Sequence, residues 1–380
     1  MPKCKNDSTK YDNESSPKGL GILSINKDIG SIELGKDRNK WIVTKKSCTK
    51  LNSNQKNISD YLQSEFLNCI EKCNQILSFL NEYTDLKNLW MTSNKLWNGE
   101  ERKSLCYLTL NESKSYEYWN SKKIRDYIES RVLNPNQQIS LYLIGCYDIK
   151  NTNYLGNVHT LDLSYSYGIT DVSSLGKVHT LNLSNCNRIT DVSALGKVHT
   201  LNLSGCYGIK DVSDLGNVHT LDLRGCIEIR DVSRLGNNYI LNLSYCNQIT
   251  DVSMLGNVHT LDLRYCYGIT DVCALGKVHT LNLSECDGIT NVSHLGNVHI
   301  LNLYYCKKIR DVSSLGKVHT LNLSLCYKIE DVSMLGNVHT LDLRYCTRIR
   351  DVSMLGNVHT LYLKGCTRVT NMSMLTNVIV

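Results

Sequence analysis

The feature that most constrains this chain is a block of 20 residues that recurs twelve times between residues 139 and 380. Its most regular part is the pair Leu-x-Leu, which begins at Leu141 and returns every 20 residues as far as Leu361, without an insertion or deletion. One block of this length is too short to bury its own apolar side chains, whereas stacked copies align them into continuous columns. The sequence therefore predicts an elongated solenoid over 139–380 rather than a compact globular domain.

The sequence pattern of the block indicates how each coil is built. Leu-x-x-Leu-x-Leu-x-x-Cys resembles the strand part of a leucine-rich repeat, and Ile-Thr-Asp-Val-Ser resembles bacterial internalin-type repeats, which carry asparagine instead of cysteine at the turn. The resemblance implies a parallel β-sheet on the concave face. Because 20 residues leave no room for an α-helix after the strand, we expect short 3₁₀ or extended segments on the convex face.

Two further columns are assigned to the outer turn. Asp171 and its equivalents, replaced by asparagine at 151, 291 and 371, are expected to accept backbone N–H groups where each Val-Ser-x-Leu turn begins. Gly156 and its equivalents are expected to supply a tight reversal into the next strand.

Composition and charge limit the partners and the compartment. The longest apolar runs fall well short of the roughly 18 residues of a membrane span, and the polar start, Met1-Pro2-Lys3, has no apolar stretch typical of a secretory signal. We therefore expect no membrane partner, an intracellular, cytoplasmic location and reduced cysteines. Lys and Arg number 20 against 19 Asp and Glu in residues 141–380, so the repeats lack the basic excess that a nucleic-acid partner favours.

Cysteine and histidine form columns that invite a chemical interpretation. Cysteine occupies the turn in eleven coils and Ser166 replaces it in the remaining one, which indicates a buried structural thiol rather than a metal ligand. Histidine precedes the strand at His159 and nine equivalent positions, interrupted by Tyr239. We expect stacked neutral imidazoles, with a pH switch near pH 6 as the open alternative. No motif of an enzyme, a metal site or a cofactor site is found, so we predict neither catalysis nor a cofactor.

The concave face is expected to carry the partner site. Its central column, from Tyr142 and Asp162 to Tyr362, is largely asparagine and aspartate and is interpreted as a ladder in which each amide bonds the next coil. The neighbouring positions depart from the repeat in the second half, where arginine and tyrosine are typical of interface hot spots. The predicted partner-binding residues are Arg224, Arg264, Tyr304, Arg344, Lys364, Tyr245, Tyr265, Tyr305 and Tyr345.

Residues before the solenoid divide into three segments. Residues 1–57 are predicted to be mostly disordered, with a weak hairpin at Ile22–Leu34. Residues 105–138 are predicted to form a helical linker that covers the first coil.

Residues 58–104 form the third segment, which has helical spacing. Asp85, Leu86, Leu89, Ser93 and Trp97 resemble the later half of an F-box, although the usual Leu-Pro at its start is missing. The resemblance implies docking to a Skp1-like adaptor through Ile76, Leu80, Asp85, Leu86, Leu89 and Trp97.

These observations give one leading functional hypothesis and one alternative. An F-box-like segment precedes the repeats, and the proline-poor composition is similar to that of F-box and repeat proteins of giant amoeba-infecting viruses. This resemblance implies a substrate-recruiting subunit of an SCF-type ubiquitin ligase, which would act in the host cytoplasm if the protein is viral. The alternative is a repeat protein that binds or sequesters a host protein without any ligase link. Because Val378-Ile379-Val380 falls where the next strand should be, we also expect an open sheet edge that permits self-association.

Overall fold

The structure is a computed structural model that describes residues 31–37, 40–46, 107–129 and 138–370, together with Met372, Leu375 and Val378–Ile379. The F-box-like segment 58–104, with all six residues expected to contact the adaptor, lies outside the described residues. Strands β1 (Ser31–Asp37) and β2 (Lys40–Lys46) pair antiparallel as a hairpin and belong to a different compact unit from the repeats. The hairpin thus begins nine residues after the start of the expected Ile22–Leu34 segment, whose residues 22–30 lie outside the described part.

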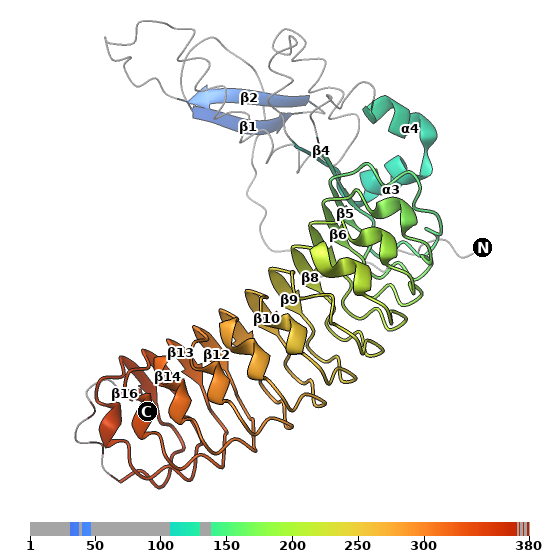
Figure 1. Cartoon of the computed structure of the whole chain (residues 1–380). Helices are drawn as coiled ribbons and strands as arrows, with labels where there is room; N and C mark the ends of the chain where they lie inside the picture. Colours follow the sequence, from blue (N-terminus) through green and yellow to red (C-terminus); the bar gives the residue numbers. More distant parts are fainter. Residues whose placement is uncertain are drawn as a thin grey trace, which may run out of the picture. The chain divides into compact units, whose positions relative to one another are not determined.

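The repeats form the leucine-rich-repeat solenoid that the sequence predicts. Within the described residues, one parallel sheet of 14 strands runs from β3 to β16 in chain order (Figure 1). Equivalent residues pair at every step from β4 to β15, as Leu161 does with Leu181, whereas at the last step Leu361 pairs with Val378, the equivalent of Val358. The strands are β3 Tyr107–Thr109, β4 Gln138–Tyr142, β5 Thr160–Asp162, β6 Thr180–Asn182, β7 Thr200–Asn202, β8 Thr220–Asp222, β9 Ile240–Asn242, β10 Thr260–Asp262, β11 Thr280–Asn282, β12 Ile300–Asn302, β13 Thr320–Asn322, β14 Thr340–Asp342, β15 Thr360–Tyr362 and β16 Val378–Ile379.

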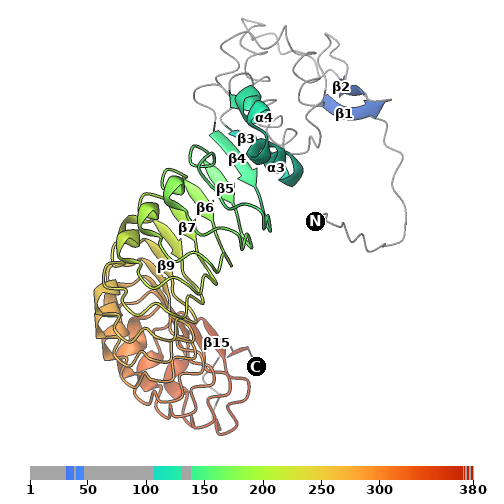
Figure 2. The ribbon, with the colours of Figure 1, turned by 90° about the vertical axis from the view of Figure 1, so that its right-hand side faces the viewer.

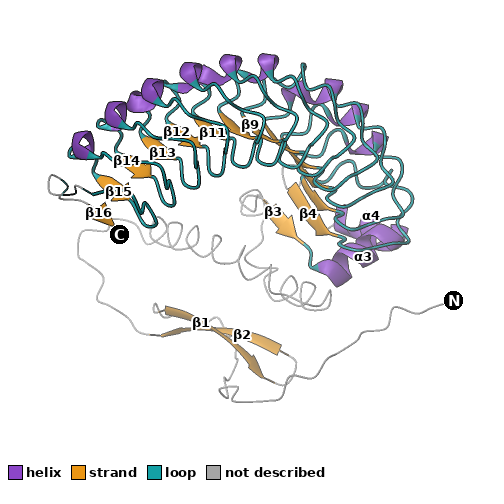
Figure 3. Ribbon diagram, turned by 90° about the horizontal axis from the view of Figure 1, so that it is seen from below, coloured by secondary structure: helices purple, strands orange, loops and turns teal. Residues whose placement is uncertain are grey.

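Short 3₁₀ helices lie on the other side of the coils, as expected for a 20-residue repeat. The strands line the inner side of the arc formed by the repeats and the helices its outer side (Figure 3). The helices are η3 Ser173–Leu175, η4 Ser193–Leu195, η5 Ser213–Asn217, η6 Ser253–Leu255, η7 Cys273–Lys277, η8 Ser293–Leu295, η9 Ser313–Lys317, η10 Ser333–Leu335 and η11 Ser353–Leu355. The coil between η5 and η6 makes turns in place of a 3₁₀ helix.

The described part of the segment before the first coil contains one strand and two helices. Helices α3 (Glu112–Asn120) and α4 (Lys122–Tyr127) follow β3, which adds a strand that the sequence analysis missed (Figure 2). Tyr118 from α3 is 1% exposed and belongs to the same apolar core as Leu141. At the other end, β16 pairs with β15, as expected for the Val378–Ile379 segment.

The core is a set of apolar columns that run through all coils. In the coil from Leu161, the side chains of Leu161, Leu163, Ile169, Val172 and Leu175 are at most 2% exposed, and their equivalents are buried in the same way along the solenoid. Each coil therefore buries its leucines only because a neighbour covers them, which is the physical basis of a repeat protein.

The outer turn confirms one expectation and corrects another. Asp171 Oδ1 accepts the backbone N–H of Ser173 at 2.9 Å, and this bond recurs at each described aspartate or asparagine of the column. Gly176, however, has a φ of −63°, which any residue can adopt. A Cβ there would lie 2.2 Å from the carbonyl oxygen of Ala194 in the next coil. The glycine is therefore required for close approach between coils, and not for a reversal.

Candidate functional site

The central column of the concave face is structural, but its bonds differ from the predicted ladder. Asp162 Oδ1 accepts the N–H of Ser164 at 2.9 Å, and the same contact within one coil recurs from Asn182 to Asp342. Among the described residues, the one side-chain bond between neighbouring coils in this column runs from Asn182 Nδ2 to Asp162 Oδ2, at 3.0 Å. The amide and carboxylate groups therefore fix the end of their own strand by an Asx turn.

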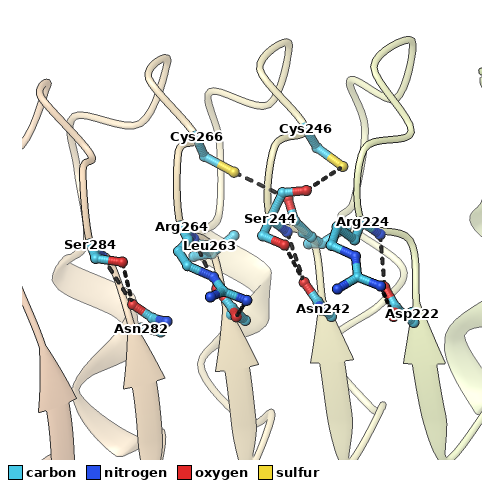
Figure 4. Close-up of polar contacts among 12 residues, drawn as sticks. Asp222, Arg224, Asn242, Ser244, Cys246, Leu263, Arg264, Cys266, Asn282 and Ser284 are labelled. Atoms are coloured by element: carbon cyan, nitrogen blue, oxygen red, sulfur yellow. Dashed lines mark hydrogen bonds and ion pairs between the residues drawn. The ribbon is translucent and has the colours of Figure 1, made fainter. Parts of the chain in front are cut away.

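The arginines of the predicted partner surface are neutralised by the same column. Arg264 lies 2.9 Å from Asp262, Arg344 lies 2.6 Å from Asp342, and Arg224 lies 3.6 Å from Asp222. Figure 4 shows Arg224 against Asp222, with Ser244 and Asn242 on the next strand. The hydrogen bond to Asp342 also raises the pKa of Arg344. The predicted surface thus offers oriented guanidinium groups without an excess of positive charge.

The tyrosines of the predicted surface occupy strained backbone just after the C-terminal ends of the strands. Tyr245, Tyr265, Tyr305 and Tyr345 have φ values of 59–64°, in the left-handed region, where Gly205, Gly225 and Gly365 stand in other coils. A bulky side chain is uncommon there because its Cβ crowds the following carbonyl, at a cost of about 1–2 kcal/mol. Aromatic residues that persist at such positions favour a role for their side chains. We call this column the left-handed edge.

Contacts within and between coils hold these tyrosines in place. The rings of Tyr245 and Tyr265 stack with centroids 4.4 Å apart, and Lys307 Nζ lies 4.0 Å above the ring of Tyr305. A hydrogen bond to Glu285, followed by desolvation, raises the pKa of Tyr265 to about 12. Tyr245 and Tyr345 still expose 43% and 45% of their surface. Exposed but immobilised tyrosines lose little entropy on binding, as interface anchors require.

The histidines lie at the opposite, N-terminal ends of the strands, and we call their column the histidine edge. His159, His179 and His199 stack with centroids 4.5–4.6 Å apart, and Tyr239 continues the stack between His219 and His259. Each Nδ1 contacts the next residue's threonine hydroxyl at 3.1–3.2 Å wherever that threonine is present. Desolvation and neighbouring imidazoles lower the pKa of four of them, His159, His199, His279 and His319. The geometry matches the expected neutral stack.

Two residues of the concave face were missed by the sequence analysis. Ile240 and Ile300 replace the threonine that follows the histidine column, and they expose 37% and 39% of their surface on β9 and β12. Exposed apolar side chains on a binding face mark contact positions when they cluster with aromatic residues. Their signal was present in the sequence, since the threonine column between Thr160 and Thr360 is interrupted at these two positions alone.

The cysteine column forms a chain of bonds between coils. Cys186 Sγ donates to the carbonyl of Leu163 in the preceding coil at 3.2 Å, and Ser166 Oγ donates to Leu143 in the same way at 3.1 Å. The serine therefore replaces cysteine without losing the bond, and burial raises the pKa of Cys186 to about 11. These thiols are structural, as expected, and they bond the preceding coil, although Cys246 Sγ also lies 4.0 Å from the carbonyl oxygen of Ser244 in its own turn. In the described part of the chain, no group of three or more His, Cys, Asp or Glu could hold a metal ion.

A hollow of about 380 Å³ lies on the outer turns, away from the concave face. Arg348, Arg350 and Arg368 line it together with Glu330, Asp331 and Asp351, and Arg348 pairs with Glu330 at 2.9 Å. The charges of its lining balance, so the hollow has no clear preference for a ligand of either charge. None of the helices in the described residues combines the length and apolar character needed to cross a membrane.

Comparison with known proteins gives structural neighbours alone, since the chain matches no protein-family model and no curated protein. It is similar to an internalin, InlF, of Listeria monocytogenes, with 19% identity over 73% of this chain and 88% of that one, and a TM-score of 0.42. The functional domain of InlJ from the same organism, described as including a cysteine ladder, matches with 18% identity over 59% and 56%, at a TM-score of 0.41. A leucine-rich-repeat protein of Leptospira interrogans matches with 16% identity over 70% and 85%, at a TM-score of 0.39.

Proposed function

We propose that this chain is a non-catalytic binding protein whose concave face, between β9 and β14, holds a partner protein. The observation that carries the proposal is where the coils differ. Apart from Asn238, the columns of buried leucine, isoleucine and valine stay apolar in the coils from 161 to 360, whereas the columns that contain Ile240, Arg264, Tyr265, Ile300 and Tyr305 change from coil to coil at half-exposed or exposed positions. Exposed columns of the outer turn also vary, but on the concave face the variable positions bring isoleucine, tyrosine and arginine together, which favours recognition.

The chemistry of this surface suits a protein of low net charge. The isoleucines and tyrosines supply apolar contact area, and the paired arginines supply oriented donors. Interfaces are typically enriched in tyrosine and arginine and depleted of unpaired charge at their centre. The predicted residues Tyr304, Arg344, Tyr345 and Lys364 extend the surface toward the last coils, and Arg224 and Tyr245 extend it toward the middle.

The test replaces selected residues of the concave face by the residues that other coils carry at the same positions. Ile240→Thr with Ile300→Thr restores the threonine of neighbouring coils, and Arg264→Ser with Tyr265→Asn copies Ser184 and Asn185. Each pair should weaken capture of the partner from amoebal lysate at least tenfold, which corresponds to about 1.4 kcal/mol. Met334→Ala, at an exposed position of η10, is the matched control and should leave capture unchanged. Equal capture by all variants would reject the concave face as the site.

The finer part of the proposal is that the chain recruits its partner to an SCF-type ubiquitin ligase. Its support is the sequence alone: Asp85, Leu86, Leu89 and Trp97 fit the later half of an F-box, and this segment precedes the repeats. Leu86 and Trp97, with Ile76 and Leu80, would contact the Skp1-like adaptor. The alternative remains a protein that sequesters its partner without a ligase.

Co-purification separates these two functions. The full chain should bring down a Skp1-like adaptor and a cullin from amoebal lysate, and Leu86→Ala with Trp97→Ala should abolish that association while capture by the concave face persists. A chain that captures its partner but neither adaptor nor cullin is a sequestering protein. Light scattering at high concentration tests the expected self-association at β16, which a purely monomeric chain would contradict.

A further inference from the structure

Side chains on the concave face alternate in size from coil to coil between residues 224 and 344, and Lys364 ends the alternation. At the position after the second buried leucine, a large side chain appears every 40 residues, at Arg224, Arg264, Tyr304 and Arg344. The coils between them carry Ser244, Ser284 and Ser324. Figure 4 shows the first part of this order, with Arg224, Ser244, Arg264 and Ser284 on successive strands.

The left-handed edge follows the same two-coil period. Tyr265, Tyr305 and Tyr345 occur at alternate coils, and Glu285 and Leu325 stand between them. Tyr245 precedes this row and stacks on Tyr265. Arg264 with Tyr265, Tyr304 with Tyr305, and Arg344 with Tyr345 therefore form three equivalent pairs, which we call the alternating row.

The spacing of the alternating row follows from the sheet. Hydrogen-bonded strands lie about 4.8 Å apart, and the rings of the histidine edge repeat at 4.5–4.7 Å between coils. Alternate coils therefore present equivalent pairs about 9.5 Å apart.

Few extended backbones repeat at that distance. A polyproline II helix has three residues per turn and a rise of about 3.1 Å, so every third residue returns to the same face after about 9.3 Å. A β-strand returns to the same face after about 6.6–6.8 Å, and an α-helix has a pitch of about 5.4 Å. Of these three backbones, only the polyproline II helix has a repeat distance close to the spacing of about 9.5 Å between alternate coils.

The side chains of the row also match this backbone chemically. Polyproline II has no internal hydrogen bonds, so its carbonyl groups are free to accept them. Arg264 and Arg344 are held by Asp262 and Asp342 and present further N–H groups, whereas Ser284 and Ser324 already donate to Asn282 and Asn322. Tyrosine rings at regular spacing are the surfaces on which proline-rich segments dock in other domains. The paired charges favour an uncharged ligand.

We propose that the alternating row binds a proline-rich segment of the partner in the polyproline II conformation, with one turn of ligand for every two coils. The inference rests on the proposed function and narrows the partner to a protein with such a segment. Arg264 and Tyr265 hold one turn, Tyr304 and Tyr305 the next, and Arg344 and Tyr345 a third.

The test uses the full chain and a fluorescein-labelled peptide of about 12 residues built from repeats of Ala-Pro-Pro, whose four turns exceed the row. Fluorescence anisotropy should show saturable binding, and a peptide with every proline replaced by alanine should bind at least tenfold more weakly. The decisive variant is Tyr305→Leu with Leu325→Tyr, which moves one ring by a single coil. Both positions have a φ of 61°, so the exchange keeps composition and backbone while it breaks the two-coil period.

The exchange should weaken binding of the proline peptide at least tenfold, with an unchanged circular dichroism spectrum. Tyr165→Ala is the control, because Tyr165 lies at the left-handed edge outside the row. Equal binding of both peptides, no binding of either, or full binding by the exchanged variant would overturn the inference. If the chain captures its partner through the concave face and excess proline peptide does not compete, the inference fails while the proposed function stands.

Discussion

The inside and the outside of the same coil obey different rules. In η6, Leu255 is fully buried and its column is leucine in every coil. Its neighbour Met254 is 59% exposed, and its column holds tyrosine, serine, alanine, aspartate, arginine, histidine and methionine. The interior is constrained because each buried side chain must fit the coil above and the coil below. An exposed position is free to vary, so its variation carries information about binding.

The largest expected effect separates these two neighbours. Leu255→Ala removes buried methyl groups that two coils share and should lower the free energy of unfolding by about 2–5 kcal/mol. Met254→Ala, one residue earlier, should change it by no more than about 0.5 kcal/mol. Urea unfolding followed by circular dichroism measures both. Similar losses for the two variants would contradict the division into inside and outside.

One interior position breaks the rule and offers a sharper test. Asn238 replaces the valine of Val218 and Val258, and is 1% exposed. Its Nδ2 donates to the carbonyls of Leu215 and Val218, but its Oδ1 has no partner among the described residues. Burial of an unsatisfied polar atom costs about 1–3 kcal/mol.

Asn238→Val should therefore raise the free energy of unfolding by about 1–2 kcal/mol in the same urea experiment. Val258→Asn introduces the amide into the next coil and is the converse control, with an expected loss of at least this size. A destabilised Asn238→Val variant would mean that the bonds of Nδ2 outweigh the unpaired oxygen.

The same division explains what the sequence could predict. Leu141, Leu161 and their equivalents set the register of the sheet because a parallel sheet of equal coils allows no other alignment of apolar columns. Strand β3 escaped prediction because three residues, Tyr107–Thr109, carry no periodicity. The role of Gly176 escaped because its constraint comes from another coil.

The candidate site was predicted only in part, for a similar reason. Arginine and tyrosine were visible as departures from the repeat, but the left-handed backbone of Tyr265 has no signature in a single coil. The pairing of Arg264 with Asp262 was readable, since arginine at this position always follows aspartate two residues earlier. Ile240 and Ile300 were overlooked because threonine and isoleucine are both enriched in strands, so the exchange does not disturb the strand pattern.

The histidine edge is on the surface, but its stacked rings contribute to the stability of the solenoid. We therefore expect the stability of the folded chain to depend on pH. In the folded chain the pKa values of His159, His199, His279 and His319 lie below the ordinary 6.5, so the folded state binds fewer protons than the unfolded chain. Stability should therefore be constant above about pH 6.5 and fall below it. Thermal melts between pH 7.5 and 5.5 measure the decline, and a flat profile would contradict it.

Tyr239 supplies the control for this prediction, because it divides the histidine edge into two runs. Tyr239→His joins His219 to His259 through a further imidazole, so more like charges would adjoin on protonation. The melting temperature of this variant should fall more steeply below pH 6.5 than that of the original chain and match it at pH 7.5. A parallel decline would assign the acid sensitivity to groups outside the stack.

The smallest effect is expected for a change inside the coil that keeps one bond. Cys246 Sγ donates to the carbonyl of Leu223 at 3.2 Å, and Ser166 makes the equivalent bond with an O–H donor at 3.1 Å. Cys246→Ser should therefore cost no more than about 1 kcal/mol, whereas Cys246→Ala, which leaves the carbonyl without this donor, should cost more by about 1 kcal/mol. Urea unfolding of both variants gives the difference. If serine were as costly as alanine, the column would depend on the size of sulfur and not on the bond between coils.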